Sequence, residues 1–168
     1  MKISLSLLQE SDAEELYEFE VQNRRFFEKM VPSRGDGYYT WETFVERHRD
    51  LLDEQANGLS QFYLVKDEEG KIAGRINLID IDKENSVAEI GFRIGEVHVG
   101  KGIGKNALRL LLEAPLAVKQ IAAKTTTVNI ASQKVLEKSG FIRIGIGDEA
   151  FEMNEQMMKF VHYLWEKE

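Results

Sequence analysis

The stretch HVGKGIGKNALRLLLE, His98 to Glu113, places three glycines within five residues directly before an apolar helical pattern. Glycine lets a backbone approach a ligand closely, and successive free amides at a helix N-terminus form a pocket for an anion. The apolar residues that follow recur at helical spacing and predict one buried stripe, made of Ile103, Ala107, Leu110, Leu111 and Ala114. The stretch therefore predicts an anion-binding turn that opens a core helix.

The charges of this turn support an anionic ligand. Lys101 and Lys105 lie in or beside the first turn of the predicted helix, where the helix dipole already contributes about half a positive charge. Without an anion, each lysine should destabilise the helix by roughly a few tenths of a kcal/mol. The alternative is a plain glycine-rich turn whose lysines extend into water.

Two known phosphate-binding motifs are matched only in part. GEVHVGKG, Gly95 to Gly102, almost forms a P-loop, but Gly102 stands where a serine or threonine hydroxyl should coordinate magnesium. Gly102, Gly104 and Ala107 satisfy the dinucleotide pattern G-x-G-x-x-A, but the chain reads AAKTTT about 20 residues further on, where an acidic residue should bind the ribose. The anion-binding turn is therefore kept, and both motifs are set aside.

Composition limits the class of protein. A chain of 168 residues that is 43% hydrophobic is long enough for one globular domain with a core. The net charge of -7 argues against a nucleic-acid partner and favours cationic partners. The chain contains no cysteine, which excludes disulfides, thiolate zinc sites and a cysteine nucleophile, and we expect no metal site. No apolar run reaches membrane-spanning length, so we expect no membrane partner and a cytoplasmic location.

The flanking patterns predict an α/β sheet. Before the glycine turn we expect a strand at 2–8, a helix or broken pair of helices at 12–30 after a Ser11–Glu14 capping box, and a loop at 31–39. A helix from Trp41 to Leu52, with a structural His48, should follow. Two strands around a tight turn at Gly70 and a strand at 86–94 come next. After it we expect a short strand at 119–126, a capped helix from Asn129 that ends at Gly140, and a tail of two long strands. Strands first in a meander and then alternating with helices indicate a mixed sheet.

Three segments together, AEIGF (88–92), the glycine turn and VNIASQKVLEKSGF (128–141), resemble the GNAT superfamily of acyl-CoA N-acyltransferases, in its RimJ/RimL-like branch of ribosomal-protein N-terminal acetyltransferases. The resemblance implies a single domain over 1–168, with a mixed, mostly antiparallel central sheet, about four helices, and a parallel strand pair splayed into a V-shaped acyl-CoA cleft. The family's turn, R/Q-x-x-G-x-G/A, wraps the pyrophosphate of acetyl-CoA. Here it falls on Val99, Gly100, Lys101, Gly102, Ile103 and Gly104, with Lys105 beside it. Val99 departs from the family's usual arginine or glutamine.

The resemblance also implies positions for the rest of acetyl-CoA and for catalysis. Pantetheine would bind backbone groups near Phe92, Arg93 and Ile94. Asn129 would contact the pantetheine or the acyl carbonyl, and Ser132 would donate a proton to the leaving sulfur. As ordinary residues, Asn129 and Ser132 are equally well explained as helix caps.

The acceptor side is less marked in the sequence. Glu89 is a candidate base for the acceptor amine, with a solvated or structural carboxylate as the alternative, because strand alternation does not say which face is wet. The family uses its first helices at the acceptor entrance. The residues at those positions are all aromatic and are equally suited to the core: Phe26, Phe27, Tyr38 and Tyr39.

Two functions of different classes follow. The favoured one is transfer of an acetyl group from acetyl-CoA to a primary amine, either a peptide N-terminus or a small amine, by a monomer or homodimer. The other is a non-catalytic acyl-CoA-binding module of the same fold, which would not need to retain Asn129 and Ser132.

Overall fold

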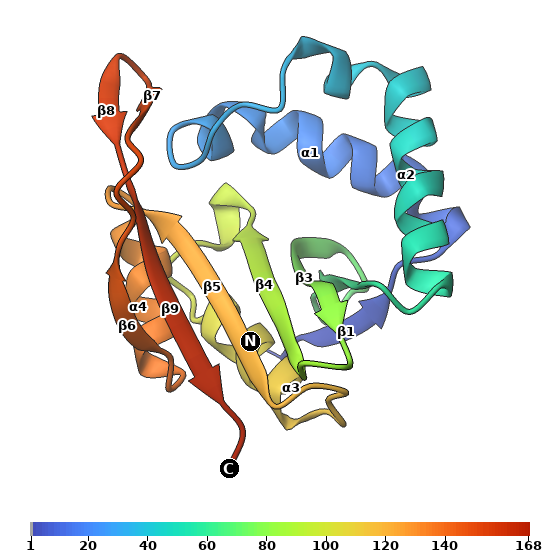
Figure 1. The fold of residues 1–168 in the computed structure, drawn as a ribbon. Helices are drawn as coiled ribbons and strands as arrows, with labels where there is room; N and C mark the ends of the chain where they lie inside the picture. The colour runs from blue at the N-terminus through green and yellow to red at the C-terminus, as the bar shows by residue number, and fades with distance from the viewer. Residues whose placement is uncertain (1) are drawn as a thin grey trace.

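The structure, a computed structural model describing residues 2–168, contains a seven-stranded sheet of order β1-β2-β3-β4-β5-β9-β6 (Figure 1). Its strands are β1 (Ser4–Leu7), β2 (Gln61–Lys66), β3 (Ile72–Asp82), β4 (Val87–Ile94), β5 (Gln120–Thr126), β6 (Ile142–Ile146) and β9 (Phe160–Glu166). Every neighbouring pair is antiparallel except β4 and β5, which are parallel. The predicted mixed, mostly antiparallel sheet is confirmed.

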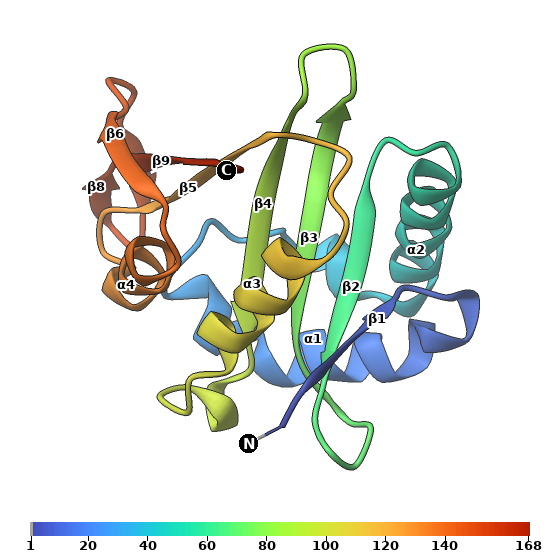
Figure 2. The same ribbon diagram turned by 90° about the horizontal axis from the view of Figure 1, so that it is seen from below.

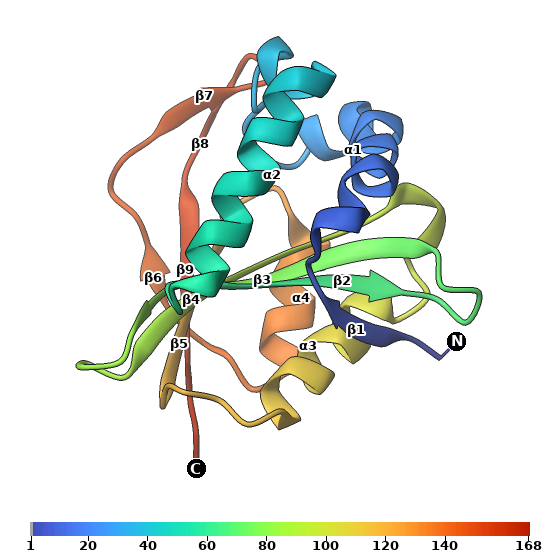
Figure 3. The ribbon, with the colours of Figure 1, turned by 90° about the vertical axis from the view of Figure 1, so that its right-hand side faces the viewer.

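Helices cover both faces of this sheet (Figures 2 and 3). On one face lie α1 (Ala13–Glu28) and α2 (Trp41–Ala56), preceded by the short turns η1 (Glu10–Asp12) and η2 (Asp36–Tyr39). The other face is covered by α3 (Ile103–Glu113) and α4 (Ile130–Lys138), and the turn η3 (Glu96–His98) precedes α3. Each face has its own apolar core. Within residues 2–168, no helix combines the length and the apolar character that crossing a bilayer requires.

The parallel pair separates along its length, as predicted. Val87–Ile90 of β4 pair with Gln120–Ala123 of β5, and the pairing stops there. Beyond that point β4 remains paired with β3 as far as Ile94, and β5 remains paired with β9 as far as Thr126. The two strands diverge toward α1 (Figure 1). Backbone groups on the inner edges of this gap lack the strand partners that they have elsewhere, so they are available to a ligand.

The glycine turn opens α3 as the sequence predicts. Gly100 and Gly102 have φ values of +81° and +75°, a left-handed conformation that residues with a Cβ rarely adopt. Gly102 is the N-cap, and the helix ends at Glu113, two residues before Pro115. The buried stripe differs from the predicted one: Leu108 is fully buried, whereas Ala114 lies outside the helix and is exposed. The helix faces both the sheet and α4, so its buried surface is wider than one stripe.

The predicted cap of the first helix is corrected. The capping interaction at the first helix uses Asp12, whose carboxylate accepts a hydrogen bond from the backbone N–H of Gln9 at 2.8 Å, rather than Ser11 and Glu14. The helical chain begins with the short turn η1, which moves the cap two residues upstream.

The tail forms four strands instead of two. Between β6 and β9 the chain forms a separate hairpin of β7 (Phe151–Met153) and β8 (Gln156–Met158). At its tip, the side-chain amide of Asn154 donates hydrogen bonds to the carbonyls of Glu28 and Lys29 at 3.1 and 3.3 Å. The hairpin therefore packs against the end of α1, a long-range contact that local patterns do not reveal.

Candidate functional site

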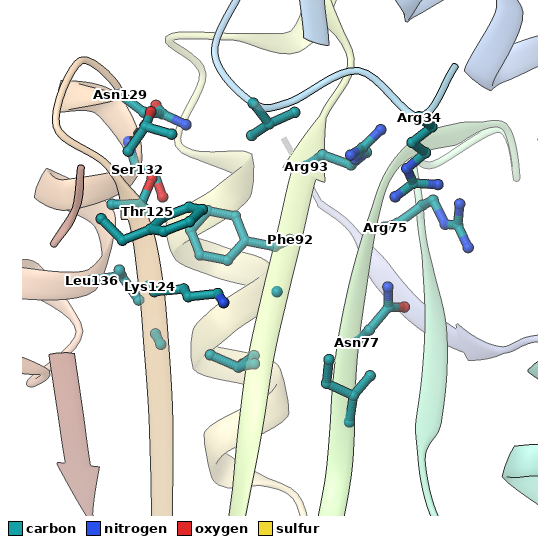
Figure 4. A pocket seen from close by; sticks show the side chains of 17 residues that line it. Arg34, Arg75, Asn77, Phe92, Arg93, Lys124, Thr125, Asn129, Ser132 and Leu136 are labelled. Carbon is teal, nitrogen blue, oxygen red and sulfur yellow. Dashed lines mark hydrogen bonds between the residues drawn. The ribbon is translucent and has the colours of Figure 1, made fainter. Parts of the chain in front are cut away.

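Two cavities meet where β4 and β5 separate. The first, here called the turn cavity, has a volume of about 430 Å³ and is lined by α1, the end of β4, the glycine turn and α4. The second, here called the arginine cavity, has a volume of about 280 Å³ and opens between β3, β4 and β5 (Figure 4). The residues lining both are Val31, Phe92, Arg93, Asn129 and Ser132. We call these shared residues the junction.

One end of the turn cavity is suited to a polyanion. Gly100, Gly102, Ile103, Gly104 and Lys105 line it and bring the N-terminus of α3 to its wall. The first amides of an α-helix have no partner within the helix, and the helix dipole makes this end positive. Lys101, by contrast, is exposed and lies outside the lining.

Side chains from two other segments complete this end of the turn cavity. Lys134 and Lys138 of α4 add two more cations. The Nδ1 atom of His98, another lining residue, is buried without a hydrogen-bond partner among residues 2–168.

The middle of the turn cavity is apolar. Its apolar lining comprises Phe26 and Phe27 of α1, Met30 just after this helix, Ile94 and Val135. Val99 also lines this cavity, at the position where the related family's arginine or glutamine would stand. An extended ligand that lies here contacts apolar side chains while the free edge of β4 offers backbone hydrogen bonds.

Asn129 and Ser132 lie at the junction because α4 begins there. The side-chain oxygen of Asn129 accepts a hydrogen bond from the backbone N–H of Ser132 at 3.2 Å, which caps the helix. This cap uses the main chain of Ser132, so the Ser132 hydroxyl takes no part in it. Both side chains line both cavities, so the capping role predicted for Asn129 does not remove either residue from the site.

Three arginines that line the arginine cavity share one buried carboxylate, which lies outside the lining. Glu20 of α1 is fully buried, and its oxygens lie 2.7 Å from Arg75, 3.2 Å from Arg93 and 3.9 Å from Arg34. Burial alone would raise the pKa of Glu20, but Arg75, Arg93 and Arg34 together lower it. The carboxylate is therefore held in its charged form by three guanidinium groups.

The arginines differ in how far Glu20 offsets the effect of burial on their pKa. Burial acts to lower the pKa of Arg75, but the adjacent Glu20 outweighs it and the net shift is upward. For Arg93, burial and then repulsion from Arg34 lower the pKa, and Glu20 does not make up the difference. Tyr38 accepts a hydrogen bond from Arg34 at 2.6 Å, which fixes that side chain at the cavity.

The predicted acceptor-side residues lie in three different places. Phe26 and Phe27 line the turn cavity, and Phe27 is almost fully buried. Tyr38 and Tyr39 lie outside both linings, where Tyr38 packs in the core between α1, α2 and the sheet. Glu89 also lies outside both linings, although it shares a sheet face with Gly91 and Arg93 and pairs with Ile79, which lines the arginine cavity.

The sequence patterns missed several polar residues of the arginine cavity. Arg75 and Asn77 are two residues apart in β3, so their side chains lie on the same face of the sheet. Strand alternation predicts this common face, but it does not predict that the face borders a cavity. Lys124 of β5 and Arg34 of the loop after α1 carry no local signal. Glu20 is separated from its arginine partners in β3 and β4 by 55 and 73 residues, so no local pattern predicts the pairing.

Comparison with known proteins gives one consistent result. The family described as "Acetyltransferase (GNAT) domain" matches residues 2–142. Among curated proteins, the chain is 31% identical over 156 residues to "Probable N-acetyltransferase YjcK" of Bacillus subtilis (strain 168), covering 88% of this chain and 84% of that protein.

Solved structures agree in fold. The ribosomal-protein-S5-alanine acetyltransferase from Vibrio fischeri matches with a TM-score of 0.90 and 21% identity, covering 100% of this chain and 94% of that one. The microcin C7 self-immunity acetyltransferase MccE, solved in complex with acetyl-CoA and AMP, matches with a TM-score of 0.86 and 26% identity, covering 98% of this chain and 92% of that one.

Proposed function

The chain belongs to the acetyltransferase (GNAT) family, and we propose that it transfers the acetyl group of acetyl-CoA to a primary amine at the junction of the two cavities. One observation carries this proposal. The glycine-rich N-terminus of α3 and an apolar cavity lead to a gap between parallel strands, where Asn129 and Ser132 also line a second cavity. A donor and an acceptor can therefore approach the same point from opposite sides.

Acetyl-CoA fits the turn cavity by its chemistry. The amides of Gly100 to Lys105 would bind the pyrophosphate, and Lys134 and Lys138 would neutralise further phosphate charge. Free backbone groups of Phe92, Arg93 and Ile94 would bind the amides of pantetheine as an added strand does. Acetyl-CoA supplies the reactive thioester. That MccE is solved with acetyl-CoA supports this assignment.

At the junction the protein contributes positioning and proton transfer. The amine nitrogen forms a bond to the thioester carbonyl carbon, the carbon–sulfur bond breaks, and the sulfur leaves with its electron pair. Ser132 would donate its hydroxyl proton to that sulfur and regain a proton from the attacking amine through solvent. Asn129 would hold the acyl carbonyl or the pantetheine. Because a free thiol has a pKa near about 8.5, the sulfur leaves readily and needs only modest assistance.

An α-amine is the acceptor that such a site favours. Unperturbed peptide α-amines have a pKa of about 7.7 to 8.0 and lysine side chains one of about 10.4, so around pH 7.4 roughly 20 to 30% of the former but only about 0.1% of the latter are neutral. A site without a strong base gains from choosing the amine that is already neutral. Glu89 remains a candidate base, acting through water, since it shares a sheet face with the arginine cavity. The activity named for the ribosomal-protein-S5-alanine acetyltransferase supports a protein as acceptor.

We further propose that residues 1–168 act as one N-acetyltransferase domain in the cytoplasm. The similarity to the ribosomal-protein-serine acetyltransferase of Escherichia coli (strain K12), at 24% identity, supports this proposal. The rival function, an acyl-CoA-binding module without turnover, is less well supported. A pure binder has no need for Asn129 and Ser132 at the end of the donor cavity.

One assay separates transfer from mere binding. The protein is incubated with acetyl-CoA and peptides that carry a free N-terminus, and both CoA thiol release and peptide mass are followed. Thiol release that matches a gain of one acetyl group per peptide supports transfer. Tight acetyl-CoA binding without either signal across the peptide panel would support the binding module instead.

A further inference from the structure

The arginine cavity carries more positive charge than nearby carboxylates neutralise. Arg34, Arg75, Arg93 and Lys124 line it, and none of its lining residues is Asp or Glu. Within residues 2–168, Glu20 is the one carboxylate that forms ion pairs with these arginines, and none pairs with Lys124. Four cations thus share a single counter-charge.

Such an excess is unfavourable in a partly dehydrated cavity unless an anion binds there. Repulsion between like charges grows as the effective dielectric constant falls from that of water. The lowered pKa of Arg93, caused by burial and by Arg34, reports this repulsion. Arg75 is already engaged with Glu20, whereas a third of the Arg34 side chain is exposed and Lys124 is exposed. Arg34 also donates to Tyr38, and the Lys124 ammonium lies 4.8 Å from the centre of the Phe160 ring. Their remaining N–H groups are the ones most available to a ligand.

The proposed donor does not account for this charge. Its phosphates would lie at the glycine turn, where Lys105, Lys134 and Lys138 line the other cavity. Arg93 lies at the junction, whereas Arg34, Arg75 and Lys124 line the arginine cavity alone and lie beyond it. Figure 4 shows Asn129 and Ser132 on one side of this cavity and Arg34, Arg75 and Arg93 across from them. They face the space left for the acceptor.

A neighbouring polar group points to the same occupant. The side-chain oxygen of Asn77 is buried and has no hydrogen-bond partner among residues 2–168, and Asn77 lines the arginine cavity. Asn77 lies on the same strand face as Arg75. This unpartnered oxygen would accept a hydrogen bond from a ligand, and the guanidinium groups would bind an anion. A ligand that carries both an N–H donor and an anionic group satisfies both requirements.

We propose that the acceptor is a primary amine that also carries an anionic group, a carboxylate or a phosphate, bound between Lys124 and the arginines of this cavity. The inference rests on the proposed acetyl transfer and specifies its substrate class. It reverses the expectation from the net charge of -7, which favoured cationic partners. Guanidinium groups bind both carboxylate and phosphate through paired hydrogen bonds, so the cavity alone is compatible with either anion.

The test uses peptides with amidated C-termini that are identical except at the second position, which is glutamate, glutamine, serine or phosphoserine. In at least one of the two pairs, the charged peptide should be acetylated with a kcat/KM at least about tenfold above that of its neutral match, as expected for a charge-assisted hydrogen bond. The pairs are glutamate against glutamine and phosphoserine against serine. The pair that shows the larger ratio identifies the anion as carboxylate or phosphate. Equal rates within both pairs would overturn the proposal.

Two variants locate the effect. Lys124→Met should reduce the preference for the anionic peptide at least about threefold, since one of the cations is removed. Lys83→Met is the matched control, because Lys83 is exposed and lies outside both cavity linings. It should leave the preference unchanged. An unaltered preference in Lys124→Met would place the anion elsewhere.

A binding measurement keeps the inference separate from turnover. The N-acetylated product peptides are titrated into the CoA-bound protein by calorimetry. An anionic product that binds more tightly than its neutral match supports the anionic acceptor even if acetylation is absent, in which case only the proposed transfer fails. Equal binding of charged and neutral products contradicts the anionic acceptor whatever the rates.

Discussion

The side-chain oxygen of Asn129 lies 3.2 Å from the backbone nitrogen of Ser132 and caps α4 at the point where the two cavities meet. The cap depends on the side chain of Asn129 but only on the main chain of Ser132. Substitutions at the two positions therefore have different consequences for stability, which allows structural and chemical roles to be measured separately.

Ser132→Ala should lower kcat by roughly ten- to a hundredfold, because the proton donor to the leaving sulfur is lost. The affinity for CoA and the melting temperature should hardly change, since the cap is retained. Steady-state kinetics and calorimetry measure these quantities. Ser139→Ala, at the other end of α4 and outside both cavities, is the control. An unchanged kcat in Ser132→Ala would leave the residue with no role in proton transfer.

Asn129→Ala should lower both stability and activity. Loss of an N-cap costs about 1 kcal/mol of unfolding free energy, measured by urea denaturation. Asn129→Asp keeps a good capping side chain, so it should restore stability but not the hydrogen-bond donors of the amide. If Asn129→Asp recovered full activity together with stability, Asn129 would act only as a cap.

Gly102→Val should weaken acetyl-CoA binding by about tenfold or more, because a left-handed backbone costs a residue with a Cβ about 1 to 2 kcal/mol and the turn must change shape. No neighbouring atom lies within 4 Å of a Cβ built at Gly102, so the effect comes from the backbone and from the ligand side. Gly37→Ala is the matched control, since its surroundings are equally open and its φ is not positive. Equal affinities for acetyl-CoA would move the pyrophosphate site away from this turn.

Glu20→Gln should destabilise the protein by about 3 to 5 kcal/mol at pH 7, because it leaves the arginines without their buried counter-charge. The pKa of Glu20 is lowered from 4.5 in the folded state. As the pH falls below 4.5, Glu20 is therefore protonated in the unfolded chain before it is protonated in the folded protein. The stability that the charged Glu20 contributes is lost as the pH approaches its folded-state pKa. The difference in unfolding free energy between wild type and variant should shrink over this acid range. A difference independent of pH would mean that Glu20 does not carry the charge.

Acceptor choice gives a further prediction. In a peptide that carries both an α-amine and a lysine side chain, mass spectrometry should find acetylation mainly at the α-amine, because a larger fraction of it is neutral near pH 7. Predominant lysine acetylation would require a strong base. Glu89→Gln would then identify whether that base is Glu89.

The glycine turn and the α4 cap were predictable because each is encoded within a few consecutive residues. The glycine turn opens α3 as predicted, with Gly102 as its N-cap, and Asn129 caps the helix predicted to begin there. The separation of β4 and β5 followed from the family resemblance and is confirmed by their register.

The arginine cavity was not predictable, because residues far apart in sequence build it. Glu20 meets Arg75 across 55 residues, and Lys124 reaches the cavity only because β5 is the parallel neighbour of β4. The net charge of the chain favoured cationic partners instead, because it counts every acidic residue, whereas the lining of this cavity contains none. Local charge follows tertiary contacts, which composition does not contain.

The most direct test of the proposed site is a crystal structure of the protein with bound CoA. The pyrophosphate is expected on the amides of Gly100 to Lys105, pantetheine along the free edge of β4, and the sulfur beside Asn129 and Ser132 at the junction. CoA bound with its sulfur away from Asn129 and Ser132, or with its pyrophosphate away from the glycine turn, would contradict the account.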